Sequence, residues 1–247
     1  IDLRPAEVLV GAHPIERTLY AASVPSRRAI AISPDGRTLA FTARRGDRQS
    51  LYVRRLDEPE AVEIEGIYDA DSPFFSPDGL SIGFWANNAL WRVPSAGGTP
   101  VRIGAAEPPA GVSWNEPDRV VFAKFETIWS VDPAGGEATQ LTTLAIGAAV
   151  RHAHPQVLPG GRWLLYSSQP RDYGWEQARV IAKSLETGEE KTLVEGAADA
   201  RFVPETGHLV YMRLGTLMAR PFDAISAESM SGEAGITDLV LQSVNRG

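Results

Sequence analysis

Five turns of the Pro-Asp-Gly type recur at nearly even spacing along this chain of 247 residues. Each turn separates two short runs of apolar, β-branched and aromatic residues, which is the pattern of an antiparallel β-hairpin. Consecutive turns are 43, 40, 42 and 45 residues apart, counted between Asp35, Asp78, Asp118, Gly160 and Glu205. A period of about 40–45 residues with several strands in each unit is typical of the blades of a β-propeller.

The residues of each repeat explain why it forms a small sheet. In a stretch such as Phe74-Phe-Ser-Pro-Asp-Gly79, proline fixes φ, aspartate bonds its own backbone and glycine accepts a positive φ. A third strand with alternating apolar residues follows, and a Gly-Gly or Thr-Gly turn leads from it to a polar outer strand. No stretch of more than ten residues keeps a helical period of apolar side chains. Strands therefore dominate the expected fold.

We predict an all-β, six-bladed β-propeller in one domain spanning residues 1–247. A blade buries its faces only against neighbouring blades, so the ring must close. For this closure we expect residues 7–11 or 17–24 to pair with 237–244, in a composite blade made from 1–28 and 236–247. The alternative is that the last blade is incomplete in this sequence. The five clear repeats span about 29–66, 71–104, 110–143, 152–196 and 198–235.

Composition narrows the class of protein. The chain is 43% apolar with a net charge of −7, which excludes a disordered chain and argues against a nucleic-acid groove. It has no cysteine, so disulfides and thiolate metal sites are excluded. The longest apolar run, Leu144 to Val150, is far shorter than the ~20 residues of a membrane span. We expect a monomeric domain without a membrane span, with any targeting segment lying outside this sequence.

Several stretches resemble TolB-like propellers built from PD40 (WD40-like) repeats. They are more closely similar to the propeller region C-terminal to many bacterial serine/threonine protein kinases. The resemblance covers most of the chain from Ala29 onward. The matching stretches are Ser72 to Gly79, Leu90 to Gly98, Gly111 to Trp114, His154 to Trp163 and Leu217 to Asp223.

This resemblance implies a non-catalytic sensor or binding platform for a protein, peptide or small ligand, without a cofactor. It also implies a periplasmic or extracytoplasmic location and membership of a larger bacterial signalling protein. A glycine-rich nucleotide loop, a His-Arg-Asp motif and an Asp-Phe-Gly motif do not occur in the sequence. The chain is therefore not itself a kinase.

One catalytic motif occurs by coincidence. Gly79-Leu-Ser-Ile-Gly83 matches the G-x-S-x-G nucleophile elbow of α/β-hydrolases. That elbow requires a turn from a strand into a helix, whereas Gly79 here closes a Pro-Asp-Gly turn. We therefore expect Ser81 to be an ordinary strand residue.

The richest polar cluster is Arg151-His-Ala-His-Pro-Gln156. In an extended strand His152, His154 and Gln156 share one face, because side chains alternate with a period of two. Two imidazoles and an amide suit a divalent metal, and oligogalacturonate lyases of this propeller type resemble the arrangement with a manganese ion. The other readings are contact with a ligand or partner, and structural packing of His154 against a neighbouring blade.

Residues just before each innermost strand are expected to ring the mouth of the channel, where mixed charges suit a peptide or a charged small molecule. Alternatively, these charges pair with one another across the ring as solvated ion pairs. The candidates are Arg27 and Arg28, Asp69 and Asp71, Pro109 and Val112, Arg151 and His152, and Asp199 and Arg201.

Six tryptophans are present, and four of them stand at apolar strand positions where packing between blades is the expected role. Trp175 differs, because it lies in a polar insertion, residues 169–177, that suits a contact surface. The predicted ligand- or partner-binding set is Arg28, Asp71, Arg151, His152, His154, Trp175, Asp199 and Arg201.

Three functions follow from this pattern. The first is a binding or sensor module, since no complete catalytic set of residues is present. The second is an enzyme: either a metal-dependent lyase at His152 and His154, or the propeller half of a prolyl-oligopeptidase-like hydrolase with its catalytic domain beyond Gly247. The third is a structural spacer.

Overall fold

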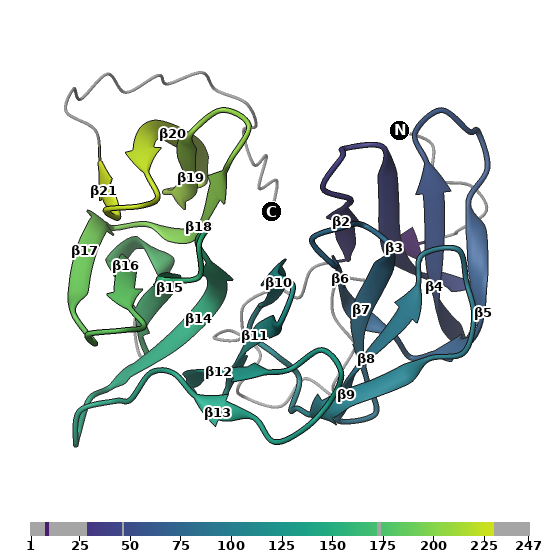
Figure 1. Cartoon of the computed structure of the whole chain (residues 1–247), viewed down its shortest axis with the longest axis horizontal. Coiled ribbons are helices and arrows are strands. Elements are labelled where there is room, and N and C mark those ends of the chain that lie inside the picture. The colour runs from purple at the N-terminus through teal and green to yellow at the C-terminus, as the bar shows by residue number, and fades with distance from the viewer. Residues whose placement is uncertain (1–7, 10–28, 46, 172–173, 230–247) are drawn as a thin grey trace. The chain divides into compact units, whose positions relative to one another are not determined.

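A computed structural model describes residues 8–9, 29–45, 47–171 and 174–229 (Figure 1). It confirms the all-β prediction: the described elements are strands, apart from one short 3-10 turn, η1 (Trp175–Gln177). The chain separates into two compact units, which are described one at a time. Unit 1 comprises Ile1–Phe125 and Trp129–Gln140, and unit 2 comprises Glu126–Ile128 and Leu141–Gly247. The expectation of a single closed domain stays a prediction.

Unit 1 carries three antiparallel sheets, each built mainly from consecutive strands. In the first, β1 (Val8–Leu9) and β2 (Ile30–Ile32) both pair with β3 (Thr38–Arg45), followed by β4 (Arg48–Arg55) and β5 (Val62–Tyr68). The second is β6 (Asp71–Phe75), β7 (Ser81–Ala86), β8 (Ala89–Pro94) and β9 (Val101–Ala105). The third is β10 (Val112–Glu116), β11 (Arg119–Lys124), β12 (Thr127–Val131) and β13 (Thr139–Gln140); the start of β12 groups with unit 2.

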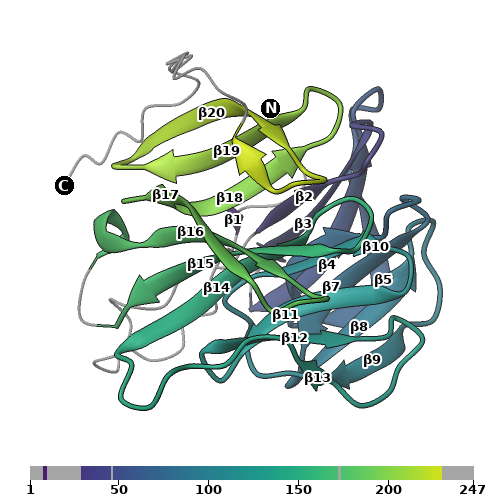
Figure 2. The same ribbon diagram turned by 60° about the vertical axis from the view of Figure 1, so that its left-hand side comes forward.

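Unit 2 carries two further sheets of four strands in sequence order, as Figure 2 shows for β14 to β17. The first is β14 (Val150–Val157), β15 (Trp163–Pro170), β16 (Arg179–Ser184) and β17 (Glu190–Glu195). The second is β18 (Ala198–Val203), β19 (His208–Arg213), β20 (Thr216–Asp223) and β21 (Glu228–Ser229). Five small antiparallel sheets therefore stand where the five repeats were predicted.

The predicted closing blade falls largely outside the described residues. Of its N-terminal part, the structure describes only Val8 and Leu9, which pair with Arg44 and Ala43 of β3. The expected partners, residues 237–244, are not among the described residues. The sixth blade therefore stays a prediction.

The two intact Ser-Pro-Asp-Gly turns are held by the same local network. In the first turn the Ser33 hydroxyl donates to Asp35 at 2.5 Å and accepts the Thr38 N–H at 2.9 Å. The second turn repeats these bonds with Ser76, Asp78 and Ser81, at 2.6 and 2.9 Å. The serine hydrogen bond lowers the pKa of each aspartate, which keeps it an acceptor. The turn chemistry is local, so sequence alone predicted these hairpins.

Three innermost strands share a bulge that sequence alternation did not predict. Ser72, His154 and Asp199 have left-handed φ values of 52°, 53° and 50° in β6, β14 and β18. In each strand the pairing register shifts by one residue at this place. An extra residue reverses the face on which later side chains lie.

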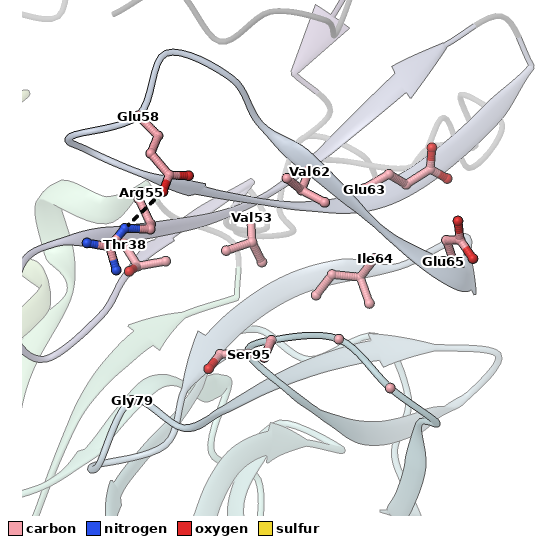
Figure 3. A pocket seen from close by; sticks show the side chains of 13 residues that line it. Thr38, Val53, Arg55, Glu58, Val62, Glu63, Ile64, Glu65, Gly79 and Ser95 are labelled. Atoms are coloured by element: carbon pink, nitrogen blue, oxygen red, sulfur yellow. Dashed lines mark ion pairs between the residues drawn. The ribbon is translucent and has the colours of Figure 1, made fainter.

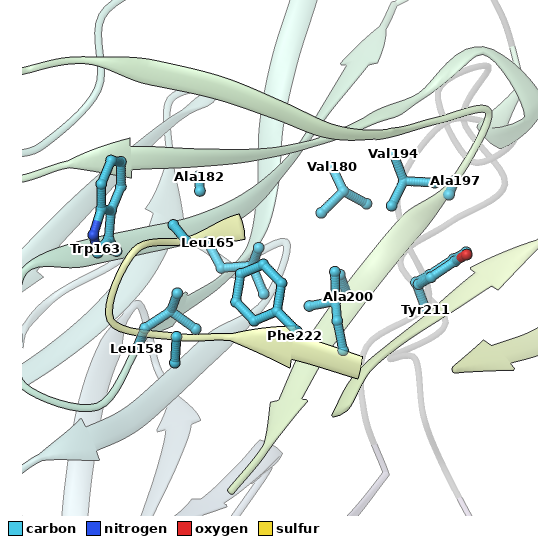
Figure 4. Packing of buried hydrophobic residues seen from close by; sticks show 13 residues of the cluster. Leu158, Trp163, Leu165, Val180, Ala182, Val194, Ala197, Ala200, Tyr211 and Phe222 are labelled. Atoms are coloured by element: carbon cyan, nitrogen blue, oxygen red, sulfur yellow. The ribbon is translucent and has the colours of Figure 1, made fainter. Parts of the chain in front are cut away.

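Each sheet is covered by the next one along the chain within its unit. In unit 2, Leu165, Val180 and Val194 of the first sheet pack with Tyr211 and Phe222 of the second (Figure 4). In unit 1 one cluster joins the first and second sheets and another joins the second and third. Burial of apolar surface between neighbouring sheets is the main stabilising term.

In the second sheet, Gly83 lies beneath the ring of a buried phenylalanine. Phe74 pairs directly with Gly83, and its ring lies over the glycine, where an added Cβ would overlap the ring carbons. The equivalent pair in the first sheet is Ala31 with Ala40. Gly83 thus leaves room for the ring of Phe74, which also contacts Trp114 edge-on at 6.5 Å.

We expect Gly83→Ala to lower the free energy of unfolding by about 1–3 kcal/mol, because the new methyl group overpacks a buried strand. In a Phe74→Ala background the same change should be neutral or stabilising, since the ring is gone and alanine costs less chain entropy than glycine. Urea unfolding of the four variants measures this coupling. Equal costs of Gly83→Ala in both backgrounds would contradict this account of the packing.

Candidate ligand-binding site

The loop that precedes β14 and the residue that follows β15 lie side by side at the start of β14 in unit 2. Residues 144–149, Leu-Ala-Ile-Gly-Ala-Ala, form a short apolar loop in which Ile146 is fully exposed. A turn bond from Ala148 N–H to Ala145 O at 2.9 Å shapes this loop. Arg171, just after β15, donates its backbone N–H to Ala149 O at 2.8 Å and ties the loop to that strand. An aliphatic side chain is therefore presented to solvent on an anchored loop.

Arg151 is the first charged residue after this apolar loop. It is half-buried, and its Nε donates to Gln169 Oε1 at 3.0 Å. Its Nη2 is buried and has no hydrogen-bond acceptor. Burial lowers the pKa of Arg151, against a raising effect of Glu126 and a further lowering effect of Arg171. An arginine stays charged in any such setting, so this guanidinium has one neutral acceptor and a surplus of donors.

His152 is turned into the protein. Its backbone N–H donates to Glu126 O at 2.8 Å, and its Nδ1 lies 2.8 Å from Thr142 Oγ1. The Thr142 hydroxyl already accepts the Ile128 N–H, so its own proton is available for Nδ1 of a neutral imidazole. The His152 ring also lies 4.7 Å from the ring of Tyr166. Burial lowers the pKa of His152 to about 4, so the residue packs as a neutral group.

The predicted common face of His152, His154 and Gln156 is wrong. The partners of His152 and Gln156 on β15 are Ser168 and Leu165, an odd number of residues apart, so the two side chains lie on opposite faces. The extra residue is the bulge at His154. Gln156 is used structurally: it accepts the Phe202 N–H at 2.8 Å and donates to Phe202 O at 3.2 Å.

Asp199 and Arg201 join the two sheets of unit 2. They form an ion pair at 3.0 Å within one strand, β18, whereas pairing of the charged candidates across the ring stays a prediction. Arg201 Nη1 also donates to the backbone oxygens of His154 and Pro155, at 3.1 and 2.9 Å. Asp199 N–H donates to Ser167 Oγ at 2.9 Å. These contacts stabilise the bulges of β14 and β18.

Of the three remaining candidates, the structure describes the side-chain contacts of Asp71 alone. Asp71 belongs to unit 1, where it is buried and accepts the N–H of the left-handed Ser72 at 2.6 Å. Arg28 lies outside the described residues. Trp175 begins η1 in the predicted insertion, after β15. Of the eight predicted site residues, unit 2 brings Arg151, His152, His154, Asp199 and Arg201 onto two adjacent strands, β14 and β18.

The structure confirms the reading of the remaining motifs. Ser81 opens strand β7, and its N–H donates to Ser76 Oγ, as expected for a strand residue. Trp85, Trp114 and Trp163 are buried in the cores between sheets. The Trp85 and Trp163 indoles donate to Ala106 O and Ile225 O, at 2.9 and 3.0 Å.

Sequence reasoning missed a cavity in unit 1. It has a volume of about 840 Å³ and lies between the outer strands of the first sheet and the Ser95–Gly98 loop of the second (Figure 3). Val53 lines it, whereas Arg92, at the equivalent position one sheet later, reaches Pro133 O at 3.0 Å. A smaller cavity, about 360 Å³, is lined by residues of β9, β11 and β12 and of the Gly136–Ala138 loop. The main charged side chains at its left end in Figure 3, Arg55 and Glu58, pair with each other at 3.3 Å.

Within the described part of the chain, no group of three or more His, Cys, Asp or Glu side chains is placed to hold a metal ion. Among the same residues, no helix has the length and hydropathy needed to cross a membrane.

Comparison with known proteins bears on the fold. No family model matches the chain. TolB from Acinetobacter baumannii superposes with a TM-score of 0.63 at 18% identity, over 78% of this chain and 51% of that one. The β-propeller domain of Cps50 (Swd1) from Myceliophteria thermophila gives a TM-score of 0.63 at 14% identity, over 83% and 68%. The fold is a TolB-like β-propeller.

One curated relative has a similar sequence. The chain is 30% identical over 146 residues to the Bacillus subtilis (strain 168) protein named "Uncharacterized peptidase YuxL". The match covers 55% of this chain and 21% of that protein. The chain thus spans about a fifth of the length of this relative and about half of the TolB chain.

The buried, neutral His152 predicts a pH dependence of stability. Its pKa is 6.5 in the unfolded chain and about 4 in the folded one, so protons favour unfolding between these values. The stabilisation is fully present above pH 6.5 and is lost as the pH falls to 4, by about 3 kcal/mol. Urea unfolding of the wild type and of His152→Gln between pH 7 and 4 measures this loss.

The variant should lack this component of the pH dependence. His208→Gln is the matched control, because His208 is a more exposed histidine of the same unit, bonded to Thr206 O. It should keep the wild-type slope. A His152→Gln slope equal to that of the wild type would show that this imidazole is not buried neutral.

Proposed function

We propose that this chain is a non-catalytic β-propeller module that binds a protein or peptide partner at the start of β14 in unit 2. The observation that carries the proposal is the exposed Ile146 on the anchored apolar loop that leads into β14, where the half-buried Arg151 lies. Arginine is enriched among the binding hot spots of protein interfaces, and an exposed apolar side chain gains free energy when a partner buries it. Arg151 lies on strand β14 and Ile146 on the loop before it, and binding residues are commonly carried by loops attached to a sheet.

The roles of the polar candidates support binding rather than catalysis. His152 is a buried neutral group bonded to Thr142, and Gln156 is bonded to the Phe202 backbone. Arg201 and Asp199 pair with each other. These side chains are used to hold sheets together, so a lyase site with a metal on His152 and His154 has no support from their arrangement.

The place of the module in a larger protein is also a proposal. The Pro-Asp-Gly repeats resemble the propellers attached to bacterial serine/threonine kinases, which favours a sensor role in a signalling protein. Within such a protein the partner or ligand would bind the propeller, and a separate domain would give the response.

A second candidate is the propeller part of a peptidase. The observation that favours it is the 30% identity to the protein named "Uncharacterized peptidase YuxL". In that case the hydrolytic residues lie in a different domain, since Ser81 here is a strand residue. Mass spectrometry of the native protein and sequencing of the complete reading frame separate the two candidates. A following hydrolase domain would favour the peptidase, and a preceding kinase domain the sensor.

The binding proposal is tested with a random seven-residue peptide library displayed on phage. Clones selected on the wild-type chain should bind at least about tenfold more weakly to Ile146→Asp, because a charge replaces the apolar anchor. Fluorescence anisotropy with the selected synthetic peptides measures the dissociation constants.

Ile225→Asp is the matched control. Ile225 is also an exposed isoleucine of unit 2, but it lies in the turn between β20 and β21. This variant should bind the peptides as the wild type does. Binding at the apolar loop would be refuted if the peptides bound Ile146→Asp as tightly as the wild type, or if both variants weakened binding equally.

A further inference from the structure

We infer that Arg151 receives a carboxylate, so that the segment bound at the apolar loop is an acidic peptide in which a glutamate or aspartate follows or precedes an apolar residue. This inference rests on the proposed function, and it specifies the chemical class of the partner. It is carried by the hydrogen bonds of Arg151, by the charges around it and by the exposed loop beside it.

The guanidinium of Arg151 has more N–H donors than hydrogen-bond acceptors around it. An arginine carries five N–H donors, and the Arg151 side chain makes one hydrogen bond, from Nε to the neutral amide oxygen of Gln169. Its Nη2 is buried without an acceptor. A buried donor without a partner is costly, and a carboxylate that met the fork of this side chain would relieve the cost.

The neighbouring charges do not neutralise Arg151. The charged groups that act on it are Glu126 and Arg171, and these two form an ion pair with each other. Two guanidinium groups thus face one carboxylate, and one positive charge is left over. This excess favours an anionic partner group over a neutral one.

Other arginines of unit 2 are already engaged. Arg201 is bonded to Asp199 and to two backbone oxygens of β14. Arg213 and Arg220 donate to the backbone oxygens of Glu195 and Leu193. Arg151 differs from Arg201 in having no carboxylate partner, and from Arg213 and Arg220 in lying directly after the exposed apolar loop.

The apolar loop favours a peptide over a free carboxylate ion. Ile146 is fully exposed, and Ala145, Gly147 and Ala149 are exposed beside it. A small carboxylate that occupied Arg151 would leave this apolar surface in water. A peptide covers both, with an apolar side chain on Ile146 and a carboxylate on Arg151, and so gains from burial as well as from charge.

The test uses two phage libraries of seven-residue peptides with identical randomised flanks. One has a fixed central glutamate and the other a fixed central glutamine. We expect peptides from the glutamate library to bind the full chain at least about tenfold more tightly than their glutamine analogues, because a charged hydrogen bond is worth that factor. Fluorescence anisotropy of synthetic pairs measures the ratio.

Arg151→Gln should abolish the preference for glutamate. Arg162→Gln is the matched control: Arg162 lies in the turn at the other end of the β14–β15 hairpin, is exposed and pairs with Glu186 at 3.3 Å. It removes the same charge from the same unit and should keep the preference. Arg151→Lys keeps the charge without the fork, and it replaces Arg151→Gln if that variant does not fold.

The outcomes separate this inference from the proposed function. Selected peptides that need Ile146 but bind equally with glutamate and glutamine overturn the inference and leave the proposed function standing. If neither library yields a binder, the proposed function falls as well. A preference for glutamate that survives in Arg151→Gln overturns the assignment to this residue. Competition by sodium acetate as strong as that by the peptide would show a site for free carboxylates instead.

Discussion

The covering of each small sheet by its neighbour is the constraint on which the rest of the structure depends. A small sheet whose strands have at most eight residues has two faces and cannot bury either by itself. In both units, apolar clusters join consecutive sheets. Polar side chains reinforce the same contacts, as Gln156 does by bonding both backbone atoms of Phe202. The side chains at these contacts hold neighbouring sheets together.

The parts of the fold that depend on local chemistry were predictable from sequence. A serine two residues before an aspartate, with proline between them, closes the turns at Asp35 and Asp78 without help from distant residues. Even spacing of such turns was enough to predict five sheets. Burial of Trp85 and Trp163 also followed from their places in apolar strands, because an aromatic ring between two sheets removes much surface from water.

Features that depend on neighbouring sheets were not predictable. Alternation of side chains along Arg151–Val157 predicted that His152 and Gln156 share one face of the strand. The bulge at the left-handed His154 puts them on opposite faces. Hydrogen bonds from Arg201, a residue of the next sheet, hold that bulge in place, and the sequence of β14 alone does not predict them. The exposure of Ile146 was equally hidden, since the run from Leu144 to Val150 has the composition of a buried strand.

The bulge at Ser72, His154 and Asp199 has a consequence for recombination between repeats. Consider a hybrid strand that takes its first half from β6 and its second half from β18. Its later side chains lie on their native faces of the sheet only if the strand keeps one left-handed bulge residue where the halves meet. A crossover that duplicates or deletes this position would move the following residues of the strand to the opposite face of the sheet. The left-handed position is therefore inherited together with the residues that follow it.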